Sequence, residues 1–241
     1  MARFHYEGEL APGSRIELPE GIARHLRVLR LRPGAAFVLF DGRGGEYPAR
    51  LVGEARRSLV AELGAHEAVE RESRLRVTLA QGISSGERMD LTIQKAVELG
   101  VAAIQPLLAG KSVVRLDAGR AAAKVAHWRR VAIAACEQCG RNRVPEVAAP
   151  VPVAGYCASL AGDGARILLS PAGGTALKDA LKPAIAAVSL AAGPEGGFDA
   201  GEEKLFAKAG FAAVRLGPRI LRTETAAPAA LAALAALTGE F

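Results

Sequence analysis

The N-terminal part of the chain alternates short apolar runs with turns that are rich in Gly and Asp. Short strands separated by regular turns are typical of a small β-barrel. We therefore expect a barrel over residues 1–70, interrupted by one helical stretch at residues 21–29. Its strands are expected at residues 16–18, 35–40, 47–53 and 58–63.

After the polar and charged segment 65–74, which we interpret as a linker, the pattern changes. Longer apolar runs now alternate with stretches of helical character. Strands that alternate with helices predict a parallel α/β sheet, here in a domain over residues 74–241. The expected strands cover 75–82, 101–109, 166–171, 185–193 and 211–217, and the expected helices cover 87–100, 117–140, 176–181, a stretch after Asp199 and 225–238.

Residues suited to helix ends support these boundaries. Asp117 and Asp199 suit the N-cap position, and Glu202 follows Asp199 at the spacing of a capping box. Gly100 and Gly140 suit left-handed conformations at the ends of their helices.

The final helix is rich in alanine and carries Leu231, Leu234 and Leu237. Pro228 would be tolerated there because the N–H groups of a helix's first turn have no internal partners. The three leucines could pack against a second subunit or inside the core of one chain, and the pattern does not choose between the two.

Two predicted strands end in loops whose composition indicates a ligand site. Residues 193–197 read GPEGG, and residues 216–227 read LGPRILRTETAA. Glycine lets the backbone approach a ligand closely. Because the carboxyl ends of neighbouring strands form the ligand crevice of an open α/β sheet, we expect these loops to line one pocket. Neither loop is a dinucleotide fingerprint, and Gln105 stands where a phosphate loop ending at 110–112 requires glycine.

The charge of the chain is uneven. Residues 1–72 carry 11 Arg and 11 acidic residues, so the net charge of +6 comes from the remainder. A basic protein suggests a polyanionic partner, with nucleic acid first. Within the neutral N-terminal part, Arg27 and Arg30 would share a helix face, and guanidinium groups match phosphate geometry. A solvated charged face is an equally good interpretation.

The three cysteines indicate neither a disulfide framework nor a metal site. An odd number of cysteines in a chain of this length makes the cytoplasm the default location. Cys136 and Cys139 have C-x-x-C spacing, but Cys157 and the scattered histidines do not complete a zinc site. No apolar run is suited to crossing a membrane, and the N-terminus lacks the apolar region of a signal peptide.

Several blocks of sequence, taken together and in order, resemble the RsmE family of SPOUT-superfamily RNA methyltransferases. The similarity extends over almost the whole chain. The blocks are HLRVLRLRPG (25–34), DGRGGEY (41–47), QGISSGERMDLTIQKAVELGV (81–101), ACEQCGRNRVPEV (135–147), GPEGGF (193–198) and LGPRILRTETAA (216–227).

The resemblance implies an α/β fold class in which a SPOUT-type domain with a trefoil knot follows a small PUA-like β-barrel that helps to hold RNA. It implies a homodimer with the knot region at the interface. It also implies that S-adenosylmethionine is used to methylate N3 of one uridine in 16S rRNA. The expected partners are therefore 16S rRNA, the small ribosomal subunit and a second copy of the chain, with no membrane and no metal.

Carried onto this chain, the resemblance places the cofactor on three loops. Backbone groups of Leu216, Ile220 and Leu221 would contact its adenine. The expected cofactor-binding residues are Leu168, Leu169, Ser170, Gly193, Pro194, Glu195, Gly196, Gly197, Leu216, Gly217, Arg219, Ile220, Leu221 and Thr223.

For catalysis, uridine N3 must lose its proton before or while it attacks the methyl group. We expect Arg222 to favour the N3 anion because a nearby cation favours the charged form of an acid. Glu224, with Glu195 as second choice, could accept the proton. For Glu224 the alternative is an acid stabilised by the helix dipole. RNA contacts, largely to phosphates, are expected from Arg27, Arg30, Arg88, Lys95, Arg141 and Arg143.

Other interpretations stay open at this point. A non-catalytic ribosome-binding or assembly factor would keep the fold without turnover, although Arg222, Glu224 and the glycine loops argue against it. A methyltransferase that acts on another RNA would share the fold and the site. A different α/β nucleotide-binding enzyme is disfavoured because the phosphate-loop and dinucleotide fingerprints are missing.

Overall fold

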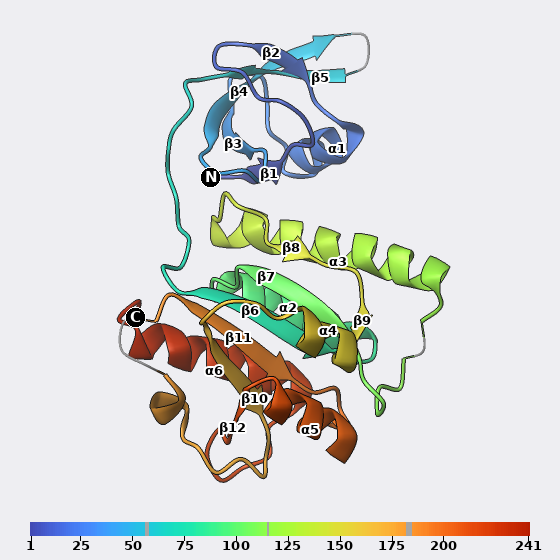
Figure 1. Ribbon diagram of the computed structural model, residues 1–241. Helices are drawn as coiled ribbons and strands as arrows, with labels where there is room; N and C mark the ends of the chain where they lie inside the picture. The colour runs from blue at the N-terminus through green and yellow to red at the C-terminus, as the bar shows by residue number, and fades with distance from the viewer. Residues whose placement is uncertain (56–57, 115, 182–184) are drawn as a thin grey trace. The chain divides into compact units, whose positions relative to one another are not determined.

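The computed structural model describes residues 1–55, 58–114, 116–181 and 185–241. Contacts divide the chain into two compact units, whose elements are labelled in Figure 1. The first unit comprises Met1–Glu72 and Cys136–Val144, and the second comprises Ser73–Ala135 and Pro145–Phe241. The boundary after Glu72 falls inside the expected linker, whereas segment 136–144 groups with the N-terminal unit and not with the domain in which it was expected.

The N-terminal unit contains a mixed five-stranded sheet in the order β1-β3-β4-β5-β2. Strands β1 and β3 are parallel, and the other neighbouring pairs are antiparallel. The four predicted strands and the helix are confirmed, whereas β1 was not predicted. The elements are β1 (Arg3–His5), β2 (Arg15–Glu17), α1 (Glu20–Val28), β3 (Ala36–Phe40), β4 (Tyr47–Ala55) and β5 (Ser58–Leu63).

Helix α1 packs against this sheet with one apolar face. Ile22, Ala23 and Leu26 are its buried residues, at spacings that place them on one side of a helix. In the same core the rings of Phe4 and Phe37 lie 6.0 Å apart in an edge-on arrangement. Full burial of a leucine such as Leu26 contributes roughly 1.5–3 kcal/mol. The apolar face therefore holds α1 in place and leaves its arginine-bearing face exposed.

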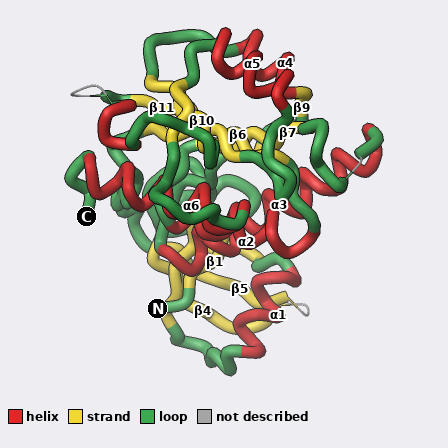
Figure 2. The backbone as a smooth tube through the Cα atoms, turned by 90° about the horizontal axis from the view of Figure 1, so that it is seen from below, coloured by secondary structure: helices red, strands yellow, loops and turns green. Residues whose placement is uncertain are grey.

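The second unit contains a seven-stranded sheet whose described strands all pair in parallel, in the order β12-β10-β11-β6-β7-β8, with β9 also on β7. Figure 2 shows α4 and α5 on one face of the sheet and α2 and α6 on the other. The elements are β6 (Arg76–Gly82), α2 (Gly86–Glu98), β7 (Ala103–Leu108), α3 (Ala118–Cys139), β8 (Glu146–Val147), β9 (Val151–Pro152), α4 (Val153–Ser159), β10 (Ala165–Leu169), the 3-10 helix η1 (Leu177–Ala180), β11 (Ala187–Ala192), α5 (Ala200–Lys208), β12 (Ala212–Val214) and α6 (Thr223–Leu237).

The predicted alternation of strands and helices is confirmed, as are the predicted caps. The Asp199 carboxylate accepts a hydrogen bond from the Glu202 N–H, and the Glu202 carboxylate accepts one from the Asp199 N–H, which completes the capping box of α5. Asp117 accepts a hydrogen bond of 2.8 Å from the N–H of Arg120. Both glycines expected at helix ends have positive φ.

Helix α6 differs from the prediction at its start. It begins at Thr223, ahead of the expected residue, so Pro228 lies in the second turn. The missing N–H of Pro228 therefore leaves the Glu224 carbonyl without its usual helical donor. The first-turn explanation for Pro228 is wrong, and the helix continues past the proline because Ala227 and Leu231 are buried on either side of it.

The structure shows whether the leucines of α6 pack inside one chain or are left for a second subunit. Leu231 and Leu234 are buried within the second unit, where α6 contacts α2, β6 and β11, whereas Leu237 is half-exposed. The first two leucines therefore belong to the core of one chain. Although α6 is apolar, no described helix is both long and apolar enough to span a membrane.

The parallel sheet brings the carboxyl ends of β10, β11 and β12 to one edge. Leu168 pairs with Ala191 of β11, and Leu169 pairs with Val214 of β12. The loops after these strands therefore start side by side. From β12 the chain returns to α6, which contacts β11 and β6 nearer the centre of the sheet. The expected knot would be formed by these loops and this returning segment, and its threading stays a prediction.

Candidate functional site

A cavity of about 620 Å³ lies where the loops after β10, β11 and β12 meet. Small-molecule pockets commonly have volumes of about 300–1,000 Å³. Most of the lining comes from residues 169–172, 192–198 and 214–226. The two glycine-containing loops that the sequence placed at one pocket, 193–197 and 216–227, therefore contribute to a single cavity.

Two residues expected to bind the cofactor lie outside this lining. Leu168 is buried with Phe198 and Phe206 in the core. Its neighbour Leu169 reaches the cavity, because successive strand residues point to opposite faces. Gly217 has a φ of +73° and forms a turn in the loop after β12. Leu168 and Gly217 are thus not part of the cavity lining, whereas the other residues expected to bind the cofactor all line it.

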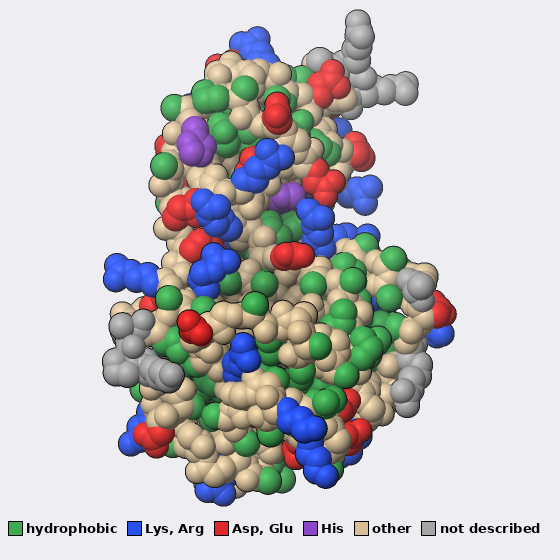
Figure 3. Space-filling view, in the orientation of Figure 1, with side chains coloured by type: hydrophobic (Ala, Val, Ile, Leu, Met, Phe, Trp, Pro, Cys, Tyr) green, Lys and Arg blue, Asp and Glu red, His purple; other side chains and the backbone are tan. Residues whose placement is uncertain are grey.

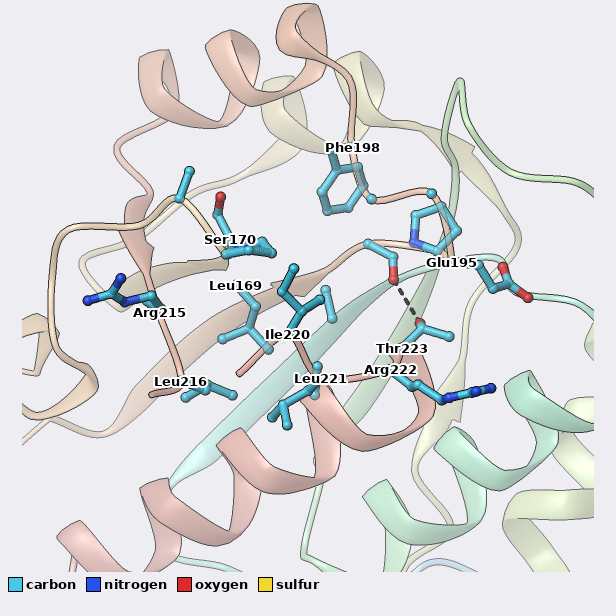
Figure 4. Close-up of a pocket in the computed structure, with 18 of the residues that line it drawn as sticks. Leu169, Ser170, Glu195, Phe198, Arg215, Leu216, Ile220, Leu221, Arg222 and Thr223 are labelled. Carbon is cyan, nitrogen blue, oxygen red and sulfur yellow. Dashed lines mark hydrogen bonds between the residues drawn. The ribbon is translucent and has the colours of Figure 1, made fainter. Parts of the chain in front are cut away.

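Apolar side chains from two loops form the middle of the pocket. In Figure 4, Leu169, Ile220 and Leu221 gather there, with Leu216 nearby. Ile220 is 81% exposed, which is unusual for an isoleucine that lines a cavity. Apolar side chains left open in a concave site are suited to cover the apolar part of a ligand.

The glycine loop after β11 is folded too tightly for side chains. A Cβ on Gly193 would lie 2.9 Å from the Cα of Gly197, and a Cβ on Gly196 would lie 3.0 Å from the Cβ of Lys111. Gly197 has a φ of +69°, in the region that favours glycine. Close packing of the loop on itself explains the glycine at 193, and the positive φ explains the glycine at 197.

The two candidate catalytic residues flank Thr223 at the start of α6. Arg222 is the N-cap residue, and its exposed guanidinium has no hydrogen-bond or ion-pair partner among the described residues. Glu224 lies in the first turn, and its Oε2 is buried without a described hydrogen-bond donor. Both line the cavity. The site therefore has an unpaired cation and a carboxylate oxygen without a described donor close together in the chain.

Glu195 has a different environment from Glu224. Its Oε1 accepts hydrogen bonds from the Ser85 N–H at 2.9 Å, the Ser85 hydroxyl at 2.7 Å and the Arg88 guanidinium at 3.0 Å. Burial would raise the pKa of this carboxyl, but the hydrogen bonds from Ser85 and Arg88 lower it to about 2. A carboxylate held so firmly in its charged form is a poor proton acceptor near neutral pH, so the second choice for the catalytic base is not supported.

Several lining residues were not expected from the sequence. Lys111 follows β7, and its ammonium donates to the carbonyl of Phe198 at 3.2 Å. Arg215 follows β12 directly, and Glu203 belongs to α5. The rule that predicted the other loops applies equally to Lys111 and Arg215, because each follows the carboxyl end of a parallel strand. Glu203 is contributed by a helix, and no sequence signal places it there.

Among the residues expected to bind RNA, Arg141 requires a correction. Its side chain is only 3% exposed and forms an ion pair with Glu72 inside the N-terminal unit. The neighbouring Asn142 is fully buried and donates to Glu46 and to the Val69 carbonyl. Burial and pairing keep Arg141 from contacting a phosphate in this conformation, so it is a structural residue of the unit.

Glu46 lies at the centre of the same group of residues. Its Oε2 accepts hydrogen bonds from Arg3 at 2.6 Å, Arg71 at 3.1 Å and Asn142 at 3.0 Å. Burial alone would raise the pKa of the Glu46 carboxyl, but these hydrogen bonds and the Arg3 charge lower it to about 2. The arrangement ties segment 136–144 to the N-terminal strands.

The other expected RNA contacts are exposed or partly exposed, and most have acidic partners. Arg27 pairs with Glu20, Arg88 with Glu195, Lys95 with Glu98 and Arg143 with Glu70. Arg30 is exposed, has no described partner, and adopts a φ of +54° just after α1. On the face drawn in Figure 3, basic and acidic side chains are interspersed. Arg30 is therefore the most available cation of this set.

The cysteines show the structural character that was expected of them. Cys136 is buried, its thiol donates to the Arg143 carbonyl, and burial raises its pKa to about 12. Within the described ranges, no group of three or more His, Cys, Asp or Glu residues could hold a metal ion.

Two family models match the chain. Residues 18–64 match an RNA methyltransferase PUA domain, and residues 71–235 match an RNA methyltransferase domain. Together with the parallel sheet and its cavity, these matches define an RNA methyltransferase that has an N-terminal PUA domain. The predicted fold class is therefore confirmed at the level of a PUA domain followed by an α/β methyltransferase domain.

Curated relatives share the name ribosomal RNA small subunit methyltransferase E. The protein of Buchnera aphidicola from Acyrthosiphon pisum is 38% identical over 70% of this chain and 67% of its own length. The protein of Aquifex aeolicus is 30% identical over 89% of this chain and 91% of its own length. This chain belongs to the ribosomal RNA small subunit methyltransferase E family, which confirms the resemblance to RsmE.

Solved structures agree with this assignment. A ribosomal RNA small subunit methyltransferase E from Neisseria gonorrhoeae, bound to S-adenosylmethionine, is 42% identical with a TM-score of 0.91, and the match covers 98% of both chains. A methyltransferase structure from Legionella pneumophila, also with S-adenosylmethionine bound, is 38% identical with a TM-score of 0.92 over 98% of this chain and 97% of its own.

Proposed function

We propose that this chain transfers the methyl group of S-adenosylmethionine to N3 of one uridine in 16S rRNA, at position 1498 in the usual rRNA numbering. The observation that carries the proposal is the cavity at the ends of β10, β11 and β12, in a chain 42% identical to a relative solved with S-adenosylmethionine. The name shared by the relatives supports the small-subunit rRNA as substrate.

The residues of the cavity fit the proposed cofactor. The apolar side chains of Leu169, Ile220 and Leu221 suit a flat adenine, and the backbone of their loops offers N–H and C=O groups to its edge. The tight glycine loop 193–197 allows the backbone to approach the rest of the molecule. When bound, S-adenosylmethionine supplies a methyl group on a positively charged sulfur, which is a good leaving group.

Arg222 would act on the uracil base. Its guanidinium is exposed at the pocket without a described acidic partner, so its charge is available to O2 or O4 of the base. Figure 4 shows Arg222 extending from the apolar middle toward the side of the pocket where Glu195 lies. A cation at this place would favour the N3 anion and would hold the base in line for transfer.

Glu224 would accept the N3 proton. Glu224 lines the cavity, and its buried Oε2 has no described hydrogen-bond donor, so this oxygen has an unused acceptor site for the N3–H group once the base is seated in the cavity. As the proton moves to the carboxylate, the N3 lone pair forms the new bond to the methyl carbon and the carbon–sulfur bond breaks. Because N3 lies on the base-pairing edge, the target uridine must be unpaired when it reaches Arg222 and Glu224.

The N-terminal unit would hold RNA with the end of α1 and the turn that follows. Val28 is 71% exposed and Leu29 48% exposed, between the exposed Arg27 and Arg30. Apolar side chains beside arginines suit an unpaired base and its phosphates. Replacement of Arg30 by Ala should lower the affinity for RNA by a similar factor whatever the RNA sequence, and it should make that affinity less dependent on salt. Binding titrations at several salt concentrations would measure both effects. An unchanged salt dependence would remove Arg30 from the interface.

We also propose that the protein is a homodimer, as the family resemblance implies. The half-exposed Leu237 at the end of α6 and the exposed Phe241 beyond the helix are apolar side chains that a second copy could cover. Light scattering on the purified protein would test this, and a monomer at micromolar concentration would contradict it.

The decisive experiment for the activity is transfer of a labelled methyl group from S-adenosylmethionine, followed by nucleoside analysis. Deproteinised 16S rRNA and small subunits from cells that lack the enzyme would be compared as substrates. Label in 3-methyluridine at the proposed position is the expected result. Cofactor binding by calorimetry without label on either substrate would contradict the proposal.

A further inference from the structure

Residues 81–88, which read QGISSGER, belong to a block of the family resemblance, and among them only Arg88 had an assigned role, as an expected RNA contact. They connect the end of β6 to the start of α2 and contribute only Arg88 to the lining of the cavity. The polar side chains of Gln81, Ser84, Ser85 and Arg88 nevertheless bond to residues that do line it. We refer to residues 81–88 as the support segment.

The inner half of the support segment holds Thr223. The Thr223 hydroxyl donates to the Gly193 carbonyl at 2.8 Å and lies 3.1 Å from the Gln81 amide nitrogen and 3.2 Å from the Ser84 hydroxyl. The proton of the Thr223 hydroxyl goes to the Gly193 carbonyl, the Gln81 amide donates to one of its two acceptor sites, and the Ser84 hydroxyl, which also donates to the Gly82 carbonyl, contacts the other. Gln81, Ser84 and Thr223 are all buried. Thr223 is therefore a joint between β6, the loop after β11 and α6, and its hydroxyl is not free to bind a cofactor.

The outer half of the support segment holds the glycine loop. Ser85 and Arg88 together give Glu195 the three hydrogen bonds described above, at the first turn of α2. Glu195 is the one side chain of loop 193–197 that can form such bonds, since proline and glycine occupy the other positions. The conformation of the loop relative to α2 therefore depends on this carboxylate.

Gly82 between these two points is in close contact with the same loop. A Cβ on Gly82 would lie 2.4 Å from the Cδ and 2.5 Å from the nitrogen of Pro194. Neither the proline ring nor the backbone could move aside without displacing the loop. The support segment thus contacts loop 193–197 through its backbone as well as through its side chains.

We propose that residues 81–88 position the site at two separable points, an inference that rests on the proposed methyl transfer. Gln81 and Ser84 fix Thr223, and because Arg222 and Glu224 are its immediate neighbours, they fix the two residues that act on the base. Ser85 and Arg88 fix Glu195 and thereby the loop that would hold the cofactor. Loss of the inner contact should slow the chemical step, and loss of the outer contact should weaken cofactor binding.

The inner point is tested with Thr223→Val, which removes the hydroxyl at nearly constant volume, and with Thr223→Ser, which keeps it. We expect Thr223→Val to lower kcat about 10- to 100-fold, because small displacements of reacting groups have effects of this size, while Kd for S-adenosylmethionine stays close to that of the parent protein. Thr223→Ser should restore most of kcat. The matched control is Thr92→Val, a fully buried threonine of α2 whose hydroxyl bonds only to the Arg88 carbonyl in the described structure.

The inner point also has a readout that does not depend on activity. Hydrogen exchange of the amides of Thr225 and Ala226, which donate to the Arg222 carbonyl, should be faster in Thr223→Val but not in Thr92→Val. Full activity with unchanged exchange in Thr223→Val would overturn this half of the inference. A parallel loss of kcat and of cofactor affinity would also overturn it, because Thr223 would then belong to the cofactor site.

The outer point is tested with Glu195→Gln, which keeps the size of the side chain but removes its charge. Calorimetry with S-adenosylmethionine should show a Kd raised about tenfold, the effect of weakening hydrogen bonds to a charged group, with kcat at saturating cofactor nearly unchanged. The control is Glu87→Gln, an exposed acid in the first turn of α2 that has no described partner. An unchanged Kd in Glu195→Gln would overturn this half. If the parent protein binds the cofactor but methylates no rRNA, the proposed function fails, while calorimetry and hydrogen exchange still decide both halves of the inference.

Discussion

Three consecutive residues at the start of α6 have three different surroundings. Arg222 is exposed without a described acidic partner, Thr223 is buried with its hydroxyl in hydrogen-bond contact with three residues, and Glu224 has one buried oxygen without a described donor. In the sequence alone, the residue types at these three positions made each of them a candidate site residue. Only the fold separates them, because the partners of Thr223 lie far away in the chain, at Gln81, Ser84 and Gly193.

Replacement of Arg222 by Ala should lower kcat about 100-fold, since removal of one group that stabilises developing negative charge commonly has an effect of this size. Calorimetric affinity for S-adenosylmethionine should largely survive, because the guanidinium is expected to contact the base. Replacement by Lys should keep part of the activity. An exposed lysine of α5 offers the control Lys208→Ala. Equal losses of kcat and cofactor affinity would instead make Arg222 a cofactor-binding residue.

Replacement of Glu224 by Gln should produce a defect that depends on pH. Free uridine loses its N3 proton increasingly as the pH rises, so a variant without the proton acceptor should recover part of its rate at alkaline pH. The ratio of parent to variant kcat, measured across the alkaline range, should therefore fall. A ratio that stays constant with pH would assign Glu224 to the helix N-terminus, where its charge would interact with the helix dipole.

At the scale of elements, the start of β6 depends on a residue from the other end of the second unit. Glu240 Oε1 accepts hydrogen bonds from the Ser73 hydroxyl at 2.8 Å, the Arg74 N–H at 2.7 Å and the Leu75 N–H at 3.3 Å. The carboxylate thus satisfies backbone donors just before the strand that carries the support segment. A residue beyond α6 thereby fixes the beginning of a central strand.

Replacement of Glu240 by Ala should destabilise the protein by about 1–3 kcal/mol, because it leaves these donors without their charged acceptor. Urea denaturation monitored by circular dichroism would measure the change. Glu87→Ala, which removes an exposed acid without a described partner, is the control and should have little effect. Equal stabilities of the two variants would show that water replaces Glu240 at no cost.

Elements marked by an apolar run between turns or by a cap could be predicted, and elements without such a signal could not, among them the helix α4. Strand β6 and helix α5 were expected from apolar runs and from the capping box at Asp199. Strands β8 and β9 have two residues each, so alternation cannot reveal them. The start of α6 was misplaced because the N-cap is Arg222, which forms no side-chain cap that the sequence could signal.

The arginines of the sequence were not equally predictable in their surroundings. Arg222 was expected at a ligand crevice, and it lines one. Arg141 was expected at an RNA surface for equally good local reasons, yet it is buried against Glu72. Pairs of this kind join residues far apart in sequence, and a single sequence contains no information on which acid meets which base. Which of the charged side chains are exposed could therefore be learned only from the structure.

At the scale of the whole molecule, the N-terminal unit is assembled from separate stretches of chain around one acid. Glu46 binds Arg3, Arg71 and Asn142, which come from the first strand, the segment before β6 and the segment after α3. Because the carboxyl is buried among these donors, its charged form is far more stable in the folded protein than in the unfolded chain. The stability of this unit should therefore depend on acid pH.

The direction of this dependence follows from the pKa of Glu46, which is about 2 in the folded protein against an ordinary value of 4.5. Between these values the unfolded chain binds more protons, so the stabilisation is complete above pH 4.5 and is lost as the pH falls toward 2. The loss should amount to about 3 kcal/mol at most, since one pKa unit corresponds to about 1.4 kcal/mol. Denaturant titrations at successive acidic pH values should show a shallower slope for Glu46→Gln than for the parent protein, and identical slopes would contradict the prediction.

The membership of Cys136–Val144 in the N-terminal unit has a consequence for how the protein is made. During translation, Glu70 and Glu72 leave the ribosome well before their partners Arg143 and Arg141. The N-terminal unit can be completed only after residue 144 has been synthesised, when β6, α2, β7 and α3 have already emerged. The N-terminal unit therefore cannot complete its folding before a large part of the second unit has been synthesised. A gene truncated after codon 72 would encode a domain without its last segment.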